Sequence, residues 1–245
     1  MEVHHHPHAE KKGFKEYFLE FLMIFLAVTL GFFAESLREH LTDHNKEKQY
    51  MRSLLADVQN DSIELSAKEK ELKDFPAALN LLAADCNKKE LTDSMLRRMY
   101  DINIRYLGTM QIYFADKTAS QLKNAGGMRL IHNAAVADSI ALYWQGIDDV
   151  KFTYSNYENY RRPLRQLSFK IFDYTFYKDY DDRKTEFTNN HLQLTVKDPV
   201  LLKQYGSQAW LIASNIVHFY LPAIAKQKRM ANNLIVLLKK EYYLQ

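Results

Sequence analysis

Residues 17–34 read YFLEFLMIFLAVTLGFFA and decide the fold class, because Glu20 is the only charged residue in this apolar run. A helix of this length spans roughly 27 Å, close to the hydrocarbon thickness of a bilayer. We therefore predict one transmembrane helix at 13–36. The rival interpretation is a cleaved signal peptide. Since Glu35-Ser36-Leu37-Arg38 continues the helical pattern where small residues would mark a cleavage site, we expect an uncleaved anchor.

The composition of the whole chain favours helices. Its 245 residues include 7 Gly and 5 Pro, where an average composition would give about 17 and about 12. The scarcity of turn residues argues against a β-sandwich, a barrel and a glycine-looped nucleotide-binding fold. A hydrophobic content of 47% argues against disorder. A mean hydropathy of -0.40 excludes a polytopic membrane protein but allows a single span.

Charge and cysteine usage exclude further classes. The 33 basic and 30 acidic residues are interspersed and give a net charge of +3, so no concentrated basic face for nucleic acid is expected. Cys86 is the only cysteine, which rules out an intrachain disulfide and, in a monomer, a cysteine-based zinc site.

The predicted membrane helix has two different faces. At 100° per residue, small and acidic residues share one face and phenylalanines occupy the other. The first face carries Glu20, Ile24, Ala27, Gly31 and Ala34. Ala27 and Gly31 form a small-x-x-x-small pattern that lets helix backbones approach closely. We therefore expect this face to contact another copy of the chain or another membrane protein, while the phenylalanines contact the lipid bilayer.

Glu20 has three interpretations that the sequence leaves open. It lies near the apolar boundary, beside Lys11, Lys12 and Lys15, and a side chain there reaches the interface. It is therefore a snorkelling or paired structural residue, a contact between helices, or the lining of an oligomeric proton or ion conduit. Positive charge is balanced across the span, but the lysines of the tail lie closer to it. We accordingly expect the N-terminus in the cytoplasm and the C-terminal domain in the periplasm.

Histidines suggest two weak metal sites. The tail at 1–12 contains His4, His5, His6 and His8, which together can chelate a divalent transition metal ion. The competing interpretation is a flexible, pH-responsive tail. No other cofactor is expected.

The second candidate metal site is His40, His44 and Glu47, which share a face on a helix just outside the membrane. A solvated helix face is the alternative. The pattern lacks the adjacent glutamate of a metalloprotease.

Beyond the membrane we expect a helical stem at 37–75 and a soluble, antiparallel helical bundle at 76–245. Between Gly31 and Pro76 there is no glycine or proline, so the spanning helix should continue without a break. Apolar residues recur at sevens from Leu37 to Leu72 in an imperfect coiled-coil seam that should pack partly on the bundle. The bundle helices are expected at 77–86, 92–104, 114–124, from 133 or 138 to about 180, and 198–243.

The bundle sequence suggests packing more than chemistry. Five aromatic residues have helical spacing and are expected in the core or between helices: Tyr143, Trp144, Tyr154, Tyr157 and Tyr160. Five basic residues form a patch for which a solvated face is the default: Lys151, Arg161, Arg162, Arg165 and Lys170. No catalytic triad, carboxylate pair or phosphate loop is recognisable, so we expect no enzyme and identify no small-molecule substrate.

Several blocks of the chain resemble a group of single-pass membrane proteins of Gram-negative bacteria whose activity is uncharacterised. These blocks are HHHPH at 4–8, FKEYFLEFLMIFLAV at 14–28, GFFAE at 31–35, EKQYMRSL at 47–54 and TASQLKNAGGMRLI at 118–131. The resemblance covers most of the first 145 residues. It implies a location in the bacterial inner membrane and brings no activity.

The leading hypothesis is therefore a membrane-anchored, self-associating scaffold or accessory subunit of an envelope complex. The alternatives are an oligomeric ion or proton conduit lined by Glu20, and a metal-responsive membrane sensor that uses the tail.

Overall fold

The computed structural model describes residues 13–106, 108, 110–124, 126–181, 186–187 and 191–244, and this part of the chain is all-α, as predicted. Its helices are α1 (Phe14–Leu72), α2 (Phe75–Cys86), α3 (Asp93–Tyr106), α4 (Lys117–Asn124), α5 (Ala134–Ile171), α6 (Pro199–Asn215) and α7 (Leu221–Tyr242). The shorter elements are the 3-10 turns η1 (Gly127–Leu130) and η2 (Tyr174–Asp179), the π turn η3 (Ile216–Tyr220), and the two-residue strands β1 (Tyr180–Asp181) and β2 (Glu186–Phe187). The strands are antiparallel, with Tyr180 opposite Phe187.

The chain divides into two compact units, Met1–Gln49 and Tyr50–Gln245. Helix α1 contributes its first part to the first unit and residues 50–72 to the second. The division falls inside the segment expected as the stem. The second half of that segment packs within the bundle, since Met51, Val58 and Leu65 are fully buried.

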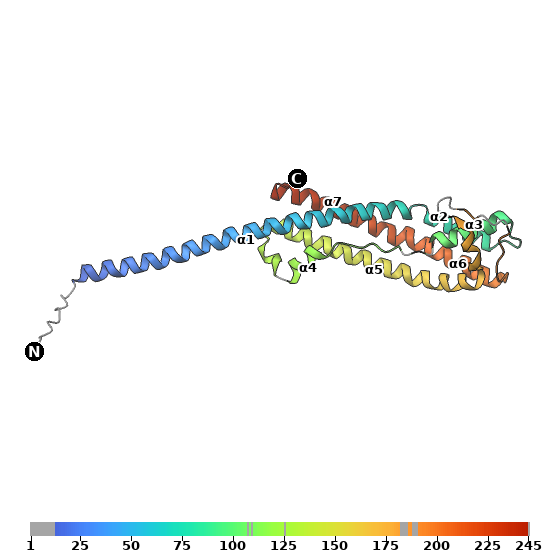
Figure 1. Ribbon diagram of the computed structural model, residues 1–245, viewed down its shortest axis with the longest axis horizontal. Helices are drawn as coiled ribbons and strands as arrows, with labels where there is room; N and C mark the ends of the chain where they lie inside the picture. Colours follow the sequence, from blue (N-terminus) through green and yellow to red (C-terminus); the bar gives the residue numbers. More distant parts are fainter. Residues whose placement is uncertain are drawn as a thin grey trace, which may run out of the picture. The chain divides into compact units, whose positions relative to one another are not determined.

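Three long helical segments run through the second unit (Figure 1). Ser62 of α1 hydrogen-bonds to Asn232 of α7, and Glu69 of α1 pairs with Lys228, so α1 and α7 are antiparallel. Helices α5 and α7 are antiparallel as well: Asn133, just before α5, bonds to Glu241 near the end of α7 (2.9 Å). It follows that α1 and α5 run in the same direction, opposite to α7.

The connection from α3 to α4 is an extended segment, 110–116, that returns along the bundle (Figure 1). Met110 and Ile112 are buried, so the backbone here needs hydrogen-bond partners. Side chains supply them. The Ala115 amide donates to Asp61 Oδ1 (2.8 Å), and the Tyr220 hydroxyl donates to the carbonyl of Met110 (2.6 Å).

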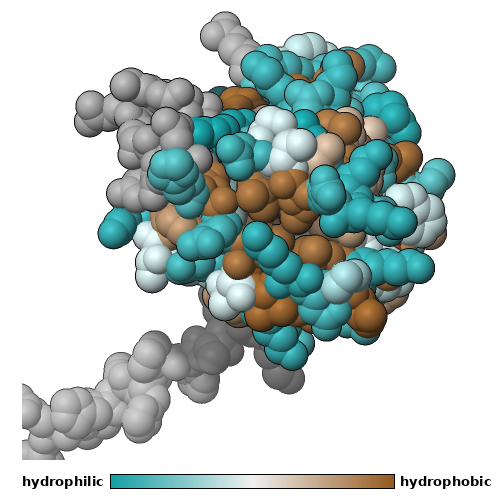
Figure 2. Space-filling view, turned by 90° about the vertical axis from the view of Figure 1, so that its right-hand side faces the viewer, coloured by the Kyte–Doolittle hydropathy of each residue, from teal (hydrophilic) through white to brown (hydrophobic). Residues whose placement is uncertain are grey.

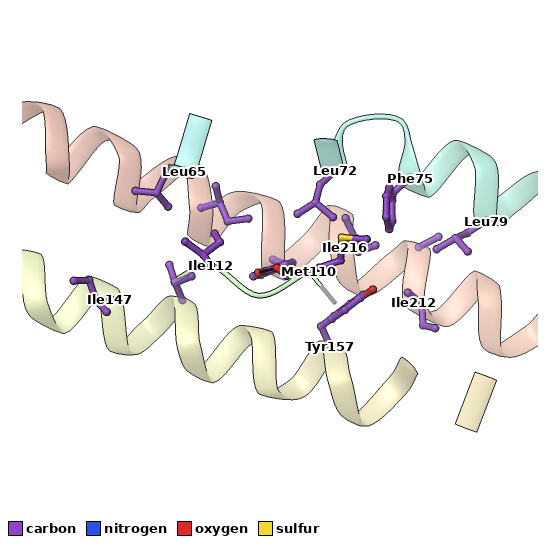
Figure 3. Close-up of a cluster of buried hydrophobic side chains, with 14 of the residues drawn as sticks. Leu65, Leu72, Phe75, Leu79, Met110, Ile112, Ile147, Tyr157, Ile212 and Ile216 are labelled. Carbon is purple, nitrogen blue, oxygen red and sulfur yellow. Dashed lines mark hydrogen bonds between the residues drawn. The ribbon is translucent and has the colours of Figure 1, made fainter. Parts of the chain in front are cut away.

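The core is continuous along the bundle (Figure 3). Side chains from all the long elements and from the extended segment point into it, and those labelled in the figure are Leu65, Leu72, Phe75, Leu79, Met110, Ile112, Ile147, Tyr157, Ile212 and Ile216. Each large aliphatic or aromatic side chain that is buried contributes about 1.5–3 kcal/mol. The bundle is therefore held together chiefly by apolar packing.

Two glycines allow the helices to approach closely. A Cβ atom at Gly206 of α6 would lie 2.8 Å from Cys86 Cβ and 3.2 Å from the carbonyl oxygen of Ala83, both in α2. At Gly146 of α5, a Cβ atom would lie 2.0 Å from Oε1 of Gln227 in α7. At Gly206, α2 and α6 therefore pack closely along their backbones, and any larger residue at this position would force the two helices apart.

The predicted helix starts agree with the structure where a capping residue was recognised. Asn133 is the N-cap of α5 and accepts from the amide of Val136 (3.3 Å). Thr92 accepts from the amide of Met95 (3.3 Å) just before α3, and Asp198 caps α6 through Val200 (2.8 Å).

Several predicted boundaries were wrong. Helix α1 ends at Leu72, earlier than predicted, because Pro76 has no N–H to donate to the Leu72 carbonyl and lies instead in the first turn of α2. Helix α4 begins at Lys117 and not at 114, because the preceding residues belong to the extended segment.

The end of α5 and the middle of the last helix also differ from the prediction. Helix α5 ends at Ile171 and not near residue 180. Directly after this end, Phe172 forms a β-bridge with Leu194, and Asp173 caps the start of η2. The last helix continues through Pro222, as predicted, but a π turn separates α6 from α7.

Candidate functional site

The first candidate site is the apolar first part of α1. It is the one helix among the described residues that is long and apolar enough to cross a bilayer, and none of its apolar window is buried. Its large side chains are exposed all round: Phe21 is 62% exposed, Ile24 66% and Phe32 74%. A helix that is hydrophobic on every side is normally covered by protein or by lipid.

The residues predicted for the interaction face lie together on this helix. Because α1 is α-helical throughout, Glu20, Ile24, Ala27, Gly31 and Ala34 share one face. Ile24, Ala27 and Ala34 are exposed, Glu20 is half-buried, and a Cβ atom at Gly31 would meet no atom within 4 Å. The helix therefore presents these residues together, as the sequence pattern predicts.

Polar groups on this part of α1 are satisfied locally. The Glu16 carboxylate accepts from the Gly13 amide (2.9 Å), which caps the start of the helix. The Thr29 hydroxyl donates to the carbonyl of Phe25 (2.7 Å), and Arg38 donates two hydrogen bonds to Glu35 (2.9 and 2.5 Å). Satisfying polar groups within the helix is what an apolar solvent requires.

Only one of the two predicted metal sites lies within the described residues. His4, His5, His6 and His8 lie outside the described residues. His44 Nδ1 is 3.9 Å from a carboxylate oxygen of Glu47, but the His44 side chain is 66% exposed and that of Glu47 only 4%. Among the described residues, no three His, Cys, Asp or Glu side chains are arranged to hold a metal ion, so His40, His44 and Glu47 do not form the expected ligand set.

The bundle contains a buried acidic residue that the sequence did not single out. Asp61 of α1 is 2% exposed and accepts from the Tyr143 hydroxyl (2.7 Å) and the Ala115 amide (2.8 Å). Burial raises the pKa of the Asp61 carboxyl above its ordinary value, and the two hydrogen bonds oppose this shift. One turn earlier, Asp57 accepts from the amide of Thr118 at the start of α4 (3.2 Å). These carboxylates hold the extended segment and α4 against α1.

A second buried network joins α3, α6 and the region after α5. Asn103 accepts from the Tyr205 hydroxyl (2.9 Å) and donates to the Tyr177 hydroxyl (2.5 Å). The Tyr100 hydroxyl donates to the carbonyl of Gln193 (2.8 Å), and burial raises the pKa of Tyr100 to about 12. These phenols therefore stay protonated at neutral pH and act as hydrogen-bonding core residues.

The predicted aromatic positions pack as expected on α5. Tyr143, Trp144 and Tyr157 are buried, and Tyr157 stacks on Tyr220 with ring centroids 5.8 Å apart. Tyr160 is 37% exposed and lies at the edge of this packing.

One member of the predicted basic patch is not a surface residue. Arg161 is 8% exposed and donates two hydrogen bonds to Glu158 (2.7 and 2.8 Å). Because its charge is paired inside the bundle, Arg161 does not belong with the solvated basic residues.

The described bundle has a cleft that sequence reasoning missed. It lies between the end of α2, the loop to α3 and the start of α6, and we call it the lysine cleft after Lys88, Lys89, Lys197 and Lys203. Figure 2 shows the end of the bundle where these elements lie, with hydrophobic surface at its middle bordered by hydrophilic side chains. The adjacent Lys88 and Lys89 were the available signal, but Lys197 and Lys203 join them only through the fold.

Comparisons with protein-family models, curated proteins and solved structures found no match.

Proposed function

We propose that this chain is a single-pass protein of the bacterial inner membrane, in which the first part of α1 is the anchor and the bundle is a scaffold. The observation that carries the proposal is the exposed apolar surface of the anchor. Phe21, Ile24 and Phe32 are each more than half exposed, and none of the apolar stretch of this helix is buried. Exposing such a continuous apolar surface to water is unfavourable, whereas the hydrocarbon of a bilayer can cover it.

Self-association through the anchor is the second part of the proposal. The face with Ala27 and Gly31 has room for a second helix, because a Cβ atom at Gly31 would contact nothing. Close approach of two backbones is the usual way in which membrane helices associate. The role is non-enzymatic: the protein assembles with copies of itself or with another membrane protein of an envelope complex.

The proposal also assigns an orientation. Lys11, Lys12 and Lys15 all lie within about six residues of the apolar run, whereas Arg38 is the only basic residue that close after it, which supports a cytoplasmic N-terminus and a periplasmic bundle. Added protease should then digest the bundle in spheroplasts with an intact inner membrane.

The test is the oligomeric state of the full chain in native membranes, measured by chemical crosslinking and by photobleaching of single labelled molecules. Wild-type protein should form dimers or larger assemblies, or crosslink to a partner. Gly31→Ile should reduce them, while Phe32→Ile, on the opposite face, should leave them unchanged. Monomeric wild-type protein without a crosslinked partner would refute the scaffold role, and equal assembly of the two variants would refute the proposed interface.

A further inference from the structure

The lysine cleft has the size of a ligand site. Its volume is about 750 Å³, within the range of roughly 300–1,000 Å³ that is usual for small-molecule pockets. Its walls come from three separate parts of the chain: the end of α2, the loop before α3 and the start of α6. Packing of α2 on α6 at Gly206 holds these parts together.

The rim of the cleft carries unneutralised positive charge. Lys88, Lys89, Lys197 and Lys203 line it together with one acidic residue, Glu90. Among the described residues, no carboxylate lies within ion-pair distance of any of these four ammonium groups. The nearby carboxylate of Asp85 is already engaged by Arg98 through two hydrogen bonds (2.8 and 2.7 Å).

The wall beneath the rim is apolar. It is formed by Cys86, Leu91, Leu96, Pro199 and Leu202, of which Cys86, Leu96 and Leu202 are buried. Burial raises the pKa of the Cys86 thiol to about 12, so this side chain is neutral at physiological pH and acts as part of the apolar wall.

A neighbouring groove extends the available space. It has a volume of about 530 Å³, lies over α5 and α6 and is lined in part by Leu167 and Val200. Lys203 lines both spaces, so the groove adjoins the cleft. Gln204, Ser207 and Gln208 also line the groove, so an elongated ligand that extends from the cleft meets Lys203 and then a surface of mixed apolar and polar side chains.

We propose that the lysine cleft binds an amphipathic anion, a molecule with a carboxylate or phosphate head and an apolar chain. The ammonium groups match the head, because Lys binds phosphate and carboxylate as a point charge. The leucines match the chain, since burying apolar surface drives its transfer from water. The same chemistry is available from free fatty acids and alkyl phosphates and from anionic membrane lipids, and the experiment separates these sources.

Native mass spectrometry provides a direct readout, because it counts the molecules bound to the full chain released from dodecyl maltoside. Dodecyl phosphate should give one bound molecule per chain at saturation. Inorganic phosphate lacks the chain and dodecanol lacks the charge, so neither should be retained.

Charge variants separate specific from general apolar binding. Lys88→Gln/Lys203→Gln should weaken dodecyl phosphate binding about tenfold, since each exposed ion pair contributes a factor of up to about five. Lys73→Gln/Lys151→Gln removes the same charge from exposed positions outside the cleft and should leave binding unchanged. Leu91→Gln, at a half-buried wall position where the fold tolerates a polar side chain, should weaken binding of the chain.

The source is tested in nanodiscs of phosphatidylcholine with or without phosphatidic acid. Retention of phosphatidic acid by the released chain indicates a membrane lipid, and retention only of added dodecyl phosphate indicates a free amphiphile; either supports the proposal. Retention of neither, equal binding by the two double variants, or retention of inorganic phosphate or dodecanol alone would overturn it.

Discussion

Gly206→Ala tests whether the α2–α6 contact depends on the missing side chain. The added Cβ atom would lie 2.8 Å from Cys86 Cβ, 3.2 Å from the Ala83 carbonyl oxygen and 3.3 Å from Ala83 Cα. Carbon atoms prefer separations of about 3.5–4.0 Å, so the helices must move apart by several tenths of an ångström or more. The opposing atoms are a Cβ and backbone, which cannot rotate away.

The expected net loss is about 1–2 kcal/mol of unfolding free energy. Overpacking of a core costs about 1–3 kcal/mol. The higher helix propensity of alanine offsets up to about 1 kcal/mol of this. For a unit of this size, the melting temperature should fall by about 2–8 °C.

Tryptophan fluorescence is a suitable assay, because both tryptophans, Trp144 and Trp210, lie in the second unit and do not report on the anchor. Full-length protein in detergent is unfolded with urea, and Ser207→Ala, at the exposed neighbouring position, serves as the control for helix propensity. In a Cys86→Gly background, Gly206→Ala should cost at least about 0.5 kcal/mol less, because the nearest opposing atom is gone. A Gly206→Ala chain as stable as wild type, or an unchanged cost in that background, would show that the close approach is not what limits this position.

Three further outcomes follow from single side chains. The pKa of Asp61 is raised in the folded state, so folding binds a proton, and wild-type stability falls as pH rises from about 4 through the raised value. The urea midpoint of Asp61→Asn should depend less on pH across this range. Parallel curves for the two proteins would contradict the assignment. Tyr243, the C-cap of α7, has a left-handed backbone (φ 53°) and is 89% exposed. Tyr243→Gly should therefore raise the free energy of unfolding by about 1 kcal/mol. A lower thermal midpoint would mean that the Tyr243 side chain stabilises the end of α7. Asp198→Ala removes the hydrogen-bond acceptor for the Val200 amide and should lower the free energy of unfolding by about 1 kcal/mol. Asp198→Ser keeps an acceptor and should not change it. Equal losses for the two variants in the same urea titration would exclude the capping role.

The sequence predicted the helical class and most helix starts because these depend on neighbouring residues. Absence of glycine and proline between Gly31 and Pro76 predicted one long helix, and Asn133 and Asp198 were recognisable caps. Helix ends were harder to predict. The end of α5 is set by Phe172, which bridges to Leu194, a residue distant in sequence. No local pattern carries that information.

The sites show the same division. The apolar first part of α1 is visible in the sequence because it depends on a continuous run. By contrast, the burial of Asp61 and of Arg161 depends on helices that meet only in the fold, although Arg161 pairs with a neighbour on its own helix, Glu158. The lysine cleft combines Lys88 with Lys203 from distant segments, so their charges looked like ordinary solvated lysines in the sequence.

The number of residues in the π turn between α6 and α7 sets the rotation of α7 relative to α6 about the helix axis. Helix α6 packs on α2 and α5, and α7 packs on α5, so each half has its own partners. Deleting one residue within Ile216–Tyr220 would rotate one half against the other by about 100°. The buried faces on the two sides could then not both stay in place. Insertions and deletions in relatives of this chain should therefore avoid this turn.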